Sequence, residues 1–476
     1  MFTLLLGVLG CATEAVDEGT TDVRVDHAKN KVESVAPQSC VNESGKVFVV
    51  WTDDREGEPQ VWFNMSADGG VTFLQQDTLL SHGEAATANP AIACAGDHVY
   101  VVWEDKRDGE LGYENIYVNW SDDAGRHWQK EDVALDNDVE GSFISIAPTV
   151  AAAGDAAWVV WSDQVSGAYD IYAVRTVNGG EEWSSPERVD TDEAGAAFSS
   201  NPVVAGDADG NVVVAWEDRR NGKTDIYVNN STDSGKTFGA DDRRVDGGDD
   251  PGASESGQLQ LVLAAPNAYV VWQDDRYGEN NDILLNYSHS SGDGWRDEAL
   301  RVESDAEGIA DSRYPAVAAQ GDRVLVAFQD NRSGGYDIFL RWSENAGSDW
   351  AEAEELRVEA DDPGEAQSYY PRIALADDTW AILWQDYRDD IEGIGFNDLY
   401  YNYTVNAGAN WQTADIRVNS TQNATSYAVD ANFYVRNGVV LTVWADGRFG
   451  SSDLFCAGRT LGTPSRWVEA EAPAGE

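Results

Sequence analysis

The sequence predicts an all-β protein: an eight-bladed β-propeller whose blades are four-stranded antiparallel sheets. One observation is a polar turn that recurs about every 55 residues, as from Ser66 to Ser121. A second is a Trp-x-Asp signature that occurs eight times, from VVWTDDREG around Trp51 to TVWADGRFG around Trp444, with Phe328 replacing Trp in the sixth copy. A third is that the repeat shows strand alternation and no helical period. Radial repetition of short strands is typical of a propeller.

Four short strands are expected in each unit, in a constant order. The first is an apolar run, often opened by proline, as in PAIAC from Pro90. The second ends at the signature tryptophan, as in HVYVVW up to Trp103. The third is rich in β-branched and aromatic residues, as in NIYVNWS from Asn115, and the fourth is short, as in ERVD from Glu187. Such alternating runs predict strands.

The two ends of the chain predict how the ring closes. The eighth unit reaches TLGTPSRW, Thr460 to Trp467, and little sequence remains for its fourth strand. The segment DVRVD, Asp22 to Asp26, matches the fourth-strand pattern and precedes every first strand. We therefore predict that this N-terminal strand completes the last blade and removes an exposed edge. The predicted propeller spans residues 22–470, and residues 471–476 form a C-terminal tail.

The N-terminus predicts export. Phe2 to Leu9 is an apolar run of signal-peptide length, far too short to span a bilayer. The following Val-Leu-Gly-Cys ends at Cys11 and resembles the bacterial lipobox, which implies lipidation of Cys11. Residues 1–11 are thus expected to be a signal peptide and residues 12–21 a tether. We expect an extracytoplasmic protein, lipid-anchored or secreted, that touches the membrane only through the anchor; a plain secretory signal is the alternative.

Three cysteines remain beyond Cys11, namely Cys40, Cys94 and Cys456. Cys40 and Cys94 fall at similar places in consecutive repeats, so a bridge between neighbouring units would fit an oxidising compartment. Buried free thiols explain the same residues, and both interpretations stay open.

The polar turns carry a family resemblance. SDDAGRHW from Ser121 and STDSGKTF from Ser231 resemble the Asp-box (BNR) repeat of sialidases and other secreted propellers, and the W-x-D-x-R-x-G-x-x-D-I-Y hairpin is similar to that of TolB-type, WD40-like propellers. The resemblance implies that these hairpins lie away from the active face. Their carboxylate or amide can accept backbone N–H groups of its own hairpin, the glycine can adopt positive φ, and the final aromatic can pack between sheets. The predicted structural residues are Asp68, Asp123, Asn178, Asp233, Asn345 and Asn406.

The chain is strongly acidic, with 85 acidic and 32 basic side chains and a net charge of −53. This charge excludes nucleic acid as a direct partner, because nucleic-acid binding needs a basic footprint. Two explanations compete: a solvation shell suited to high salt, or a surface for cations or a basic partner. Acidic loops such as DGGDDPG from Asp246 offer oxygen ligands for Ca²⁺, although none matches an EF-hand.

Two loops between blades break the symmetry of the repeat. They are the segments from Asp311 to Tyr314 and from Glu365 to Arg372, and they combine tyrosines with arginines. Placed on one side of the central opening, these groups could bind a sugar or a carboxylate; ordinary loop packing is the alternative. The candidate ligand-binding residues are Asp311, Arg313, Tyr314, Glu365, Tyr369, Tyr370 and Arg372.

The sialidase resemblance also implies a catalytic pattern, which can be compared with this chain. That family is six-bladed, with an Arg-Ile-Pro motif, three arginines, an acidic acid/base and a tyrosine nucleophile. This chain has eight units, no Arg-Ile-Pro and two symmetry-breaking arginines. We therefore predict no catalytic residue and expect a monomeric, non-catalytic binding or scaffolding propeller for a surface glycan or a protein. The alternatives are a sialidase-like glycoside hydrolase and a structural envelope or matrix protein.

Overall fold

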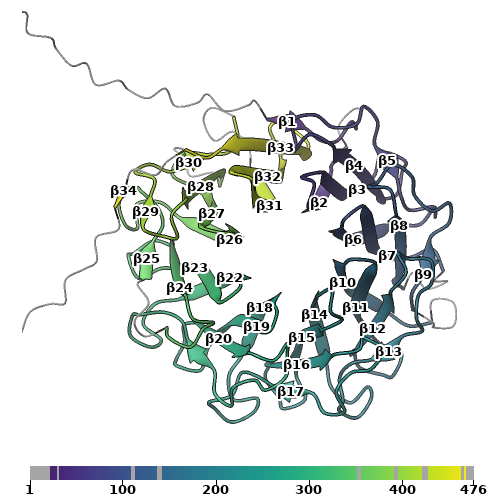
Figure 1. Cartoon of the computed structure of the whole chain (residues 1–476), viewed down its shortest axis with the longest axis horizontal. Coiled ribbons are helices and arrows are strands. Elements are labelled where there is room, and N and C mark those ends of the chain that lie inside the picture. Colours follow the sequence, from purple (N-terminus) through teal and green to yellow (C-terminus); the bar gives the residue numbers. More distant parts are fainter. Residues whose placement is uncertain are drawn as a thin grey trace, which may run out of the picture.

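Eight four-stranded antiparallel sheets surround a central opening in the computed structural model (Figure 1). The structure describes residues 22–28, 32–108, 113–136, 142–350, 355–390, 395–420, 427–462 and 466–467. These residues contain no helix, so none of the described part forms a helix able to cross a membrane. The predicted all-β, eight-bladed fold is confirmed.

The strands follow the predicted order, from the innermost strand of each blade to the outermost. Blades one to four are β2 (Val35–Val41), β3 (Val47–Asp53), β4 (Gln60–Ser66), β5 (Thr78–Leu79); β6 (Thr87–Ala95), β7 (His98–Asp105), β8 (Asn115–Ser121), β9 (Val133–Ala134); β10 (Ser145–Ala153), β11 (Ala156–Asp163), β12 (Asp170–Thr176), β13 (Glu187–Arg188); and β14 (Ser199–Gly206), β15 (Val212–Asp218), β16 (Asp225–Ser231), β17 (Arg243–Arg244).

Blades five to seven are β18 (Ser256–Ala264), β19 (Asn267–Asp274), β20 (Asp282–Ser288), β21 (Leu300–Arg301); β22 (Ser312–Gln320), β23 (Arg323–Asp330), β24 (Asp337–Ser343), β25 (Glu355–Arg357); and β26 (Ser368–Ala376), β27 (Thr379–Asp386), β28 (Asp398–Thr404), β30 (Ile416–Arg417). Blade eight is β31 (Ala428–Arg436), β32 (Val439–Asp446), β33 (Asp453–Thr460) and β1 (Val23–Arg24). A short extra ladder pairs β29 (Asn410–Trp411) with β34 (Arg466–Trp467).

The N-terminal strand closes the ring. β1 pairs antiparallel with β33, with Val23 opposite Cys456, so the first described residues complete the last blade (Figure 1). The predicted closure is confirmed. The predicted signal peptide, tether, Cys11 and C-terminal tail lie outside the described residues.

The signature tryptophans hold the blades together. Seven of them are fully buried, and each indole Nε1 donates to the aspartate two residues later, at 2.8–3.3 Å. The same aspartate accepts the arginine that follows, as Asp218 accepts the backbone N–H and guanidinium of Arg220. These repeated arginines therefore serve the fold, as expected for a group that is present in nearly every blade.

The polar turns behave as predicted. All six Asp or Asn side chains of these turns accept the backbone N–H of the residue four positions on, at 2.8–3.1 Å. The turn glycines have positive φ, for example 90° at Gly70 and 74° at Gly125. A Cβ on Gly125 would come within 2.5 Å of the Phe63 ring, so glycine is needed there for space as well. The final aromatics pack between neighbouring blades, as Trp128 does against Phe63.

Each innermost strand contains a bulge at one equivalent position. The register with the second strand shifts there in all eight blades, and one non-glycine residue takes positive φ, between 48° and 55°. In several blades its backbone N–H donates to a Glu or Gln of the preceding blade, as Ala147 does to Glu104 at 2.7 Å. The eight residues are Ala36, Asn89, Ala147, Asn201, Gln258, Tyr314, Tyr370 and Asp430.

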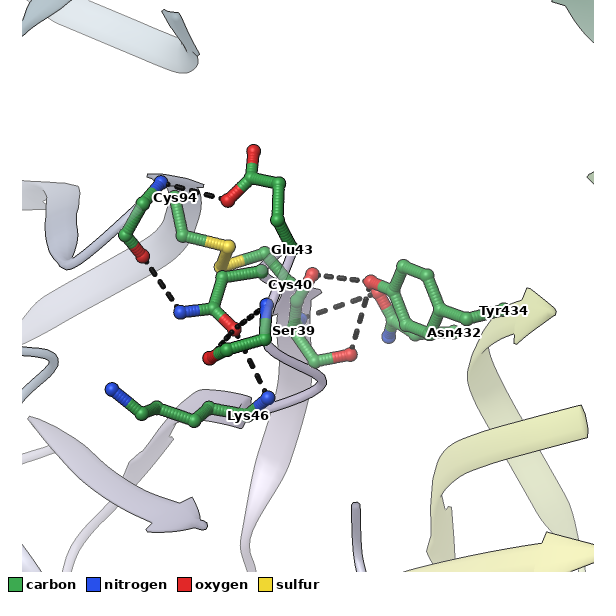
Figure 2. The surroundings of a disulfide bond; sticks show 10 residues. Ser39, Cys40, Glu43, Lys46, Cys94, Asn432 and Tyr434 are labelled. Atoms are coloured by element: carbon green, nitrogen blue, oxygen red, sulfur yellow. Dashed lines mark hydrogen bonds between the residues drawn. A yellow bond between two sulfur atoms is a disulfide. The ribbon is translucent and has the colours of Figure 1, made fainter. Parts of the chain in front are cut away.

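A disulfide links two neighbouring blades. Cys40 on β2 and Cys94 on β6 are bonded (Figure 2). Cys456 is a buried free thiol. Beside the bridge, Glu43 accepts the backbone N–H of Gly96 at 2.9 Å. The bridge between consecutive repeats, one of the two interpretations of the cysteines, is therefore present.

Candidate functional site

Five tyrosines from blades six and seven form a continuous group, which we call the tyrosine cluster. Tyr314 and Tyr370 meet edge to face with centroids 4.6 Å apart, and Tyr369 lies 6.1 Å from Tyr370. Tyr336 and Tyr387 flank Tyr369 at 5.4 and 5.6 Å. The structure thus brings the three tyrosines predicted from the loops together, and it adds two from the hairpins between second and third strands.

The bulges position the centre of this cluster. Tyr314 and Tyr370 are the positive-φ residues of their strands, with φ of 50° and 54°. Their backbone N–H groups donate to Gln273 at 3.2 Å and Gln329 at 3.0 Å in the preceding blades. Positive φ is uncommon for a bulky residue and costs of order 1 kcal/mol or more. The repeat does not require an aromatic side chain there, since Ala147 occupies the same place in blade three.

A cavity of about 460 Å³ opens beside the cluster, between blades seven and eight. Its wall includes Tyr370, Arg372, Gln385, Tyr387 and Asp430. The cavity therefore combines aromatic faces, an amide, a guanidinium and a carboxylate, which is the mixture expected of a small-molecule site.

Arg372 and Asp430 are the two charged groups of this wall. Both side chains are exposed to solvent where they line the cavity. Enclosure by protein lowers the pKa of the Arg372 guanidinium, an effect that the charge of Asp430 partly offsets. Enclosure raises the pKa of the Asp430 carboxyl, and Arg372 acts in the opposite direction. The hydrogen bond found for the Arg372 side chain goes to the carbonyl of Pro371, at 3.2 Å, so its outer nitrogens can serve a ligand.

Arg313 is less free than the sequence suggested. Its Nε lies 2.8 Å from Asp311, which also accepts Tyr336 Oη at 2.7 Å and Asn281 Nδ2 at 3.1 Å. Burial acts to raise the pKa of Asp311, but these hydrogen bonds outweigh it and lower that pKa. Burial and the bond to Asp311 raise the pKa of Tyr336 to about 12. Asp311 and Arg313 thus brace the edge of the tyrosine cluster.

The two predicted arginines do not converge. Arg313 precedes the bulge of its strand, whereas Arg372 follows the bulge of the next blade and lines the cavity. Glu365 lies exposed in the turn before β26, where its backbone N–H donates to the carbonyl of Asp362 at 3.1 Å. Asp430 was missed by sequence reasoning. The signal that could have found it is its alignment with Tyr314 and Tyr370 at the bulge position.

Two groups of three carboxylates have oxygen atoms within 4.8 Å of one another, close enough to share a metal ion. They are Asp170, Asp190 and Asp192, from β12 and the loop after β13, and Asp282, Glu303 and Asp305, from β20 and the loop after β21. A guanidinium already sits among the acids of each group: Arg188 lies 2.9 Å from Asp190 and 3.1 Å from Asp170. Arg301 lies 3.1 Å from Glu303 in the same arrangement.

Blades one and two show what this arginine does. In these two blades Leu79 and Ala134 replace it, and the first acid of the group becomes Gln60 or Asn115. The buried carboxylate at that position therefore occurs only where a guanidinium neutralises it. The acids of each group therefore serve as ion-pair partners of an arginine in the same blade. They retain the geometry to bind a cation if the guanidinium were displaced.

No protein-family model and no curated protein matches the sequence. Among solved structures, the chain is similar to the polysaccharide lyase Uly1, with 10% identity, a TM-score of 0.50 and coverage of 92% of this chain and 100% of that one. It is also similar to a Fusarium graminearum GH93 α-L-arabinofuranosidase in complex with arabinobiose (11% identity, TM-score 0.41, 93% and 98% covered). A Hadza microbial sialidase, Hz136, has 15% identity and a TM-score of 0.36 over 71% and 74%. At these identities the similarity shows the propeller fold alone.

Proposed function

We propose that the cavity and the tyrosine cluster bind a neutral glycan, with the sugar rings packed on Tyr370 and its neighbours. The observation that carries this proposal is the convergence of aromatic faces with Arg372, Gln385 and Asp430 on one 460 Å³ cavity. Aromatic rings contribute large contact areas to apolar sugar faces, while the polar groups can exchange hydrogen bonds with hydroxyls. The polysaccharide lyase Uly1 has the same fold, which supports a glycan as the ligand class.

Charge favours a neutral ligand over an acidic one. In the cavity wall Arg372 faces one carboxylate, Asp430, and at the cluster edge Arg313 is paired with Asp311. The site is thus close to neutral, within a chain of net charge −53 whose field would repel a polyanion at low salt. A single guanidinium in the cavity wall can bind vicinal hydroxyls without needing a carboxylate on the sugar.

Calorimetric titration with neutral oligosaccharides would test the proposal. Arabinan, xylan, glucan and galactan oligomers are added to the wild-type protein and to the Tyr370→Ala and Arg372→Gln variants. We expect one of these sugars to bind, and each substitution to weaken binding by about tenfold, as loss of a central interface group does. Val165→Ala, an exposed side chain of blade three, is the control. Equal affinity of the wild type and both site variants would exclude this site.

A glycoside hydrolase is the second candidate function, and Asp430 is the observation that favours it. Its raised pKa favours the protonated form, which is the form that a general acid needs. The usual mechanism requires two carboxylates, and among the described residues that line the cavity Asp430 is the carboxylate present. Wild type and Asp430→Asn are incubated with the bound sugar and with a panel of aryl glycosides that includes a sialoside. Release of reducing sugar or chromophore by the wild type, and its loss in the variant, establishes an enzyme.

We also propose that the protein is exported and monomeric, and anchored through Cys11. The Cys40–Cys94 disulfide supports export, because such bridges persist in oxidising compartments. Fractionation of cells that express wild type and Cys11→Ser would test the anchor, with loss from the membrane fraction expected for the variant. Calcium binding stays a prediction, and Arg188 already lies among the acids of one candidate group.

A further inference from the structure

Tyr427 presents an aromatic face to solvent close to the cavity. It directly precedes β31, three residues before Asp430, which corresponds to roughly 10 Å of extended strand. Just over half of its surface, 54%, is exposed. Phe396 contacts its ring, with centroids 5.9 Å apart. The same strand therefore carries an exposed aromatic platform at its start and part of the cavity wall, Val429 and Asp430, immediately after it.

Gly447, in the hairpin of blade eight, lies next to this ring. A Cβ added to Gly447 would lie 3.4 Å from Cε2 of Tyr427, and the Gly447 backbone N–H donates to the Tyr427 carbonyl at 3.2 Å. Gly447 does not have positive φ, so its backbone does not demand glycine. The equivalent residue is larger in the other seven blades: Asp54, Lys106, Gln164, Arg219, Asp275, Asn331 and Tyr387. Gly447 therefore lies against the Tyr427 ring, at a distance that a methyl group would also tolerate.

We propose that Tyr427, supported by Phe396 and Gly447, is a second stacking site for the glycan that occupies the cavity. The ligand is then a chain of several sugar units that leaves the cavity along the start of β31, and not a single sugar. This inference rests on the proposed function. It is carried by the continuity of the platform with the cavity along one strand, and by the exposure of the Tyr427 ring.

Phe198 offers a matched control. It directly precedes β14, as Tyr427 precedes β31, and 45% of its surface is exposed. It also has an aromatic partner, Tyr169, at 4.9 Å. Blade four lies across the central opening from blade eight (Figure 1), so Phe198 shares the local structure of Tyr427 and not its position near the cavity.

The experiment compares disaccharides and hexasaccharides of the same neutral polymers in calorimetric titrations. Tyr427→Ala and Gly447→Asn are expected to weaken hexasaccharide binding by about tenfold and to leave disaccharide binding unchanged. Phe198→Ala is expected to change neither, and Tyr370→Ala is expected to weaken both lengths.

The outcomes separate the two proposals. If Tyr370→Ala weakens both lengths while Tyr427→Ala changes neither, or changes both equally, the second stacking site is wrong and the cavity proposal stands. If Tyr370→Ala changes neither length, the cavity proposal fails. If Phe198→Ala weakens hexasaccharide binding as much as Tyr427→Ala, the ligand spans the opening and the proposed path along β31 is wrong. Absence of binding for every sugar overturns both proposals.

Discussion

Arg448 in the last blade and Asp22 in the N-terminal segment form a buried ion pair, with 2.6 Å between Nη1 and Oδ2. The same carboxylate oxygen accepts the backbone N–H and the hydroxyl of Ser420, each at 2.8 Å. One aspartate therefore joins the beginning of the chain to blades seven and eight.

The first prediction concerns this closure. Asp22→Ala should lower the free energy of unfolding by about 3 kcal/mol, because it leaves a buried guanidinium with one partner fewer. Urea denaturation measures the loss. Hydrogen exchange should accelerate at Val25 and Leu454, whose backbone N–H groups bond across the closing strand. In Asp242→Ala, which removes the equivalent acid that Arg220 binds in blade four, those two amides should stay protected; equal exchange in both variants would contradict a special role for Asp22.

The second prediction concerns pH. Burial first, and then Asp170, raise the pKa of Asp190 to about 7, against the effect of Arg188. The unfolded chain releases this proton near pH 4. The folded state therefore binds more protons between about pH 4 and 7, and the free energy of unfolding falls as pH rises through that window.

Asp190→Asn removes this titration, because an amide does not ionise. The variant should gain stability relative to wild type as pH rises from about 4 to 7, and keep a constant advantage above that. Thermal unfolding of both proteins across this range tests the sign. The chain has a net charge of −53, and the repulsion among its charges affects the stability of both proteins. This contribution cancels when the stability of the wild type is subtracted from that of the variant. A difference that does not vary with pH would show that Asp190 is ionised throughout.

The third prediction concerns the disulfide. Cys40 and Cys94 are 54 residues apart, and closing a loop of that size in the unfolded chain corresponds to about 4 kcal/mol in the chain-entropy model. The Cys40→Ser, Cys94→Ser double variant should lose stability by up to about this amount. Reducing agent should destabilise wild type and leave the double variant unchanged. Equal sensitivity of both proteins to reductant would mean that the bridge does not form.

The fourth prediction concerns calcium. Arg188 provides the positive charge for Asp170, Asp190 and Asp192. Calcium binding at this cluster should therefore be weak, and the melting temperature of the wild type should change little with calcium or with a chelator. Arg188→Ala leaves three carboxylates facing one another and should make stability depend on calcium. The measurement is the melting temperature with millimolar calcium and with chelator. A large calcium effect in wild type, lost in Asp192→Asn, would show that the ion displaces the arginine.

The architecture could be read from the sequence because its signals repeat. Each strand pattern occurs in eight copies, so an ambiguous residue in one copy does not change the assignment. The segment Asp22–Asp26 has the fourth-strand pattern, and the last blade is the one that lacks a fourth strand of its own. The site was only partly predictable because it depends on exceptions to the pattern. Asp430 escaped notice since Ala431 stands where most blades have the proline that marks the strand. Arg313 and Arg372 looked alike in their loops, yet they lie on opposite sides of the bulge, whose register shift sequence spacing does not reveal.

The bulge of the innermost strands also has a consequence for how this ring can acquire new ligands. In blades three and six the N–H of the positive-φ residue is bound by the blade before it, at Ala147 and at Tyr314 alike, so the main chain and not the side chain secures the position. Side chains as different as alanine, glutamine, tyrosine and aspartate occupy the eight copies. Ligand specificity can therefore change through the substitution of one residue in a single blade, because the packing of the sheets does not use that side chain.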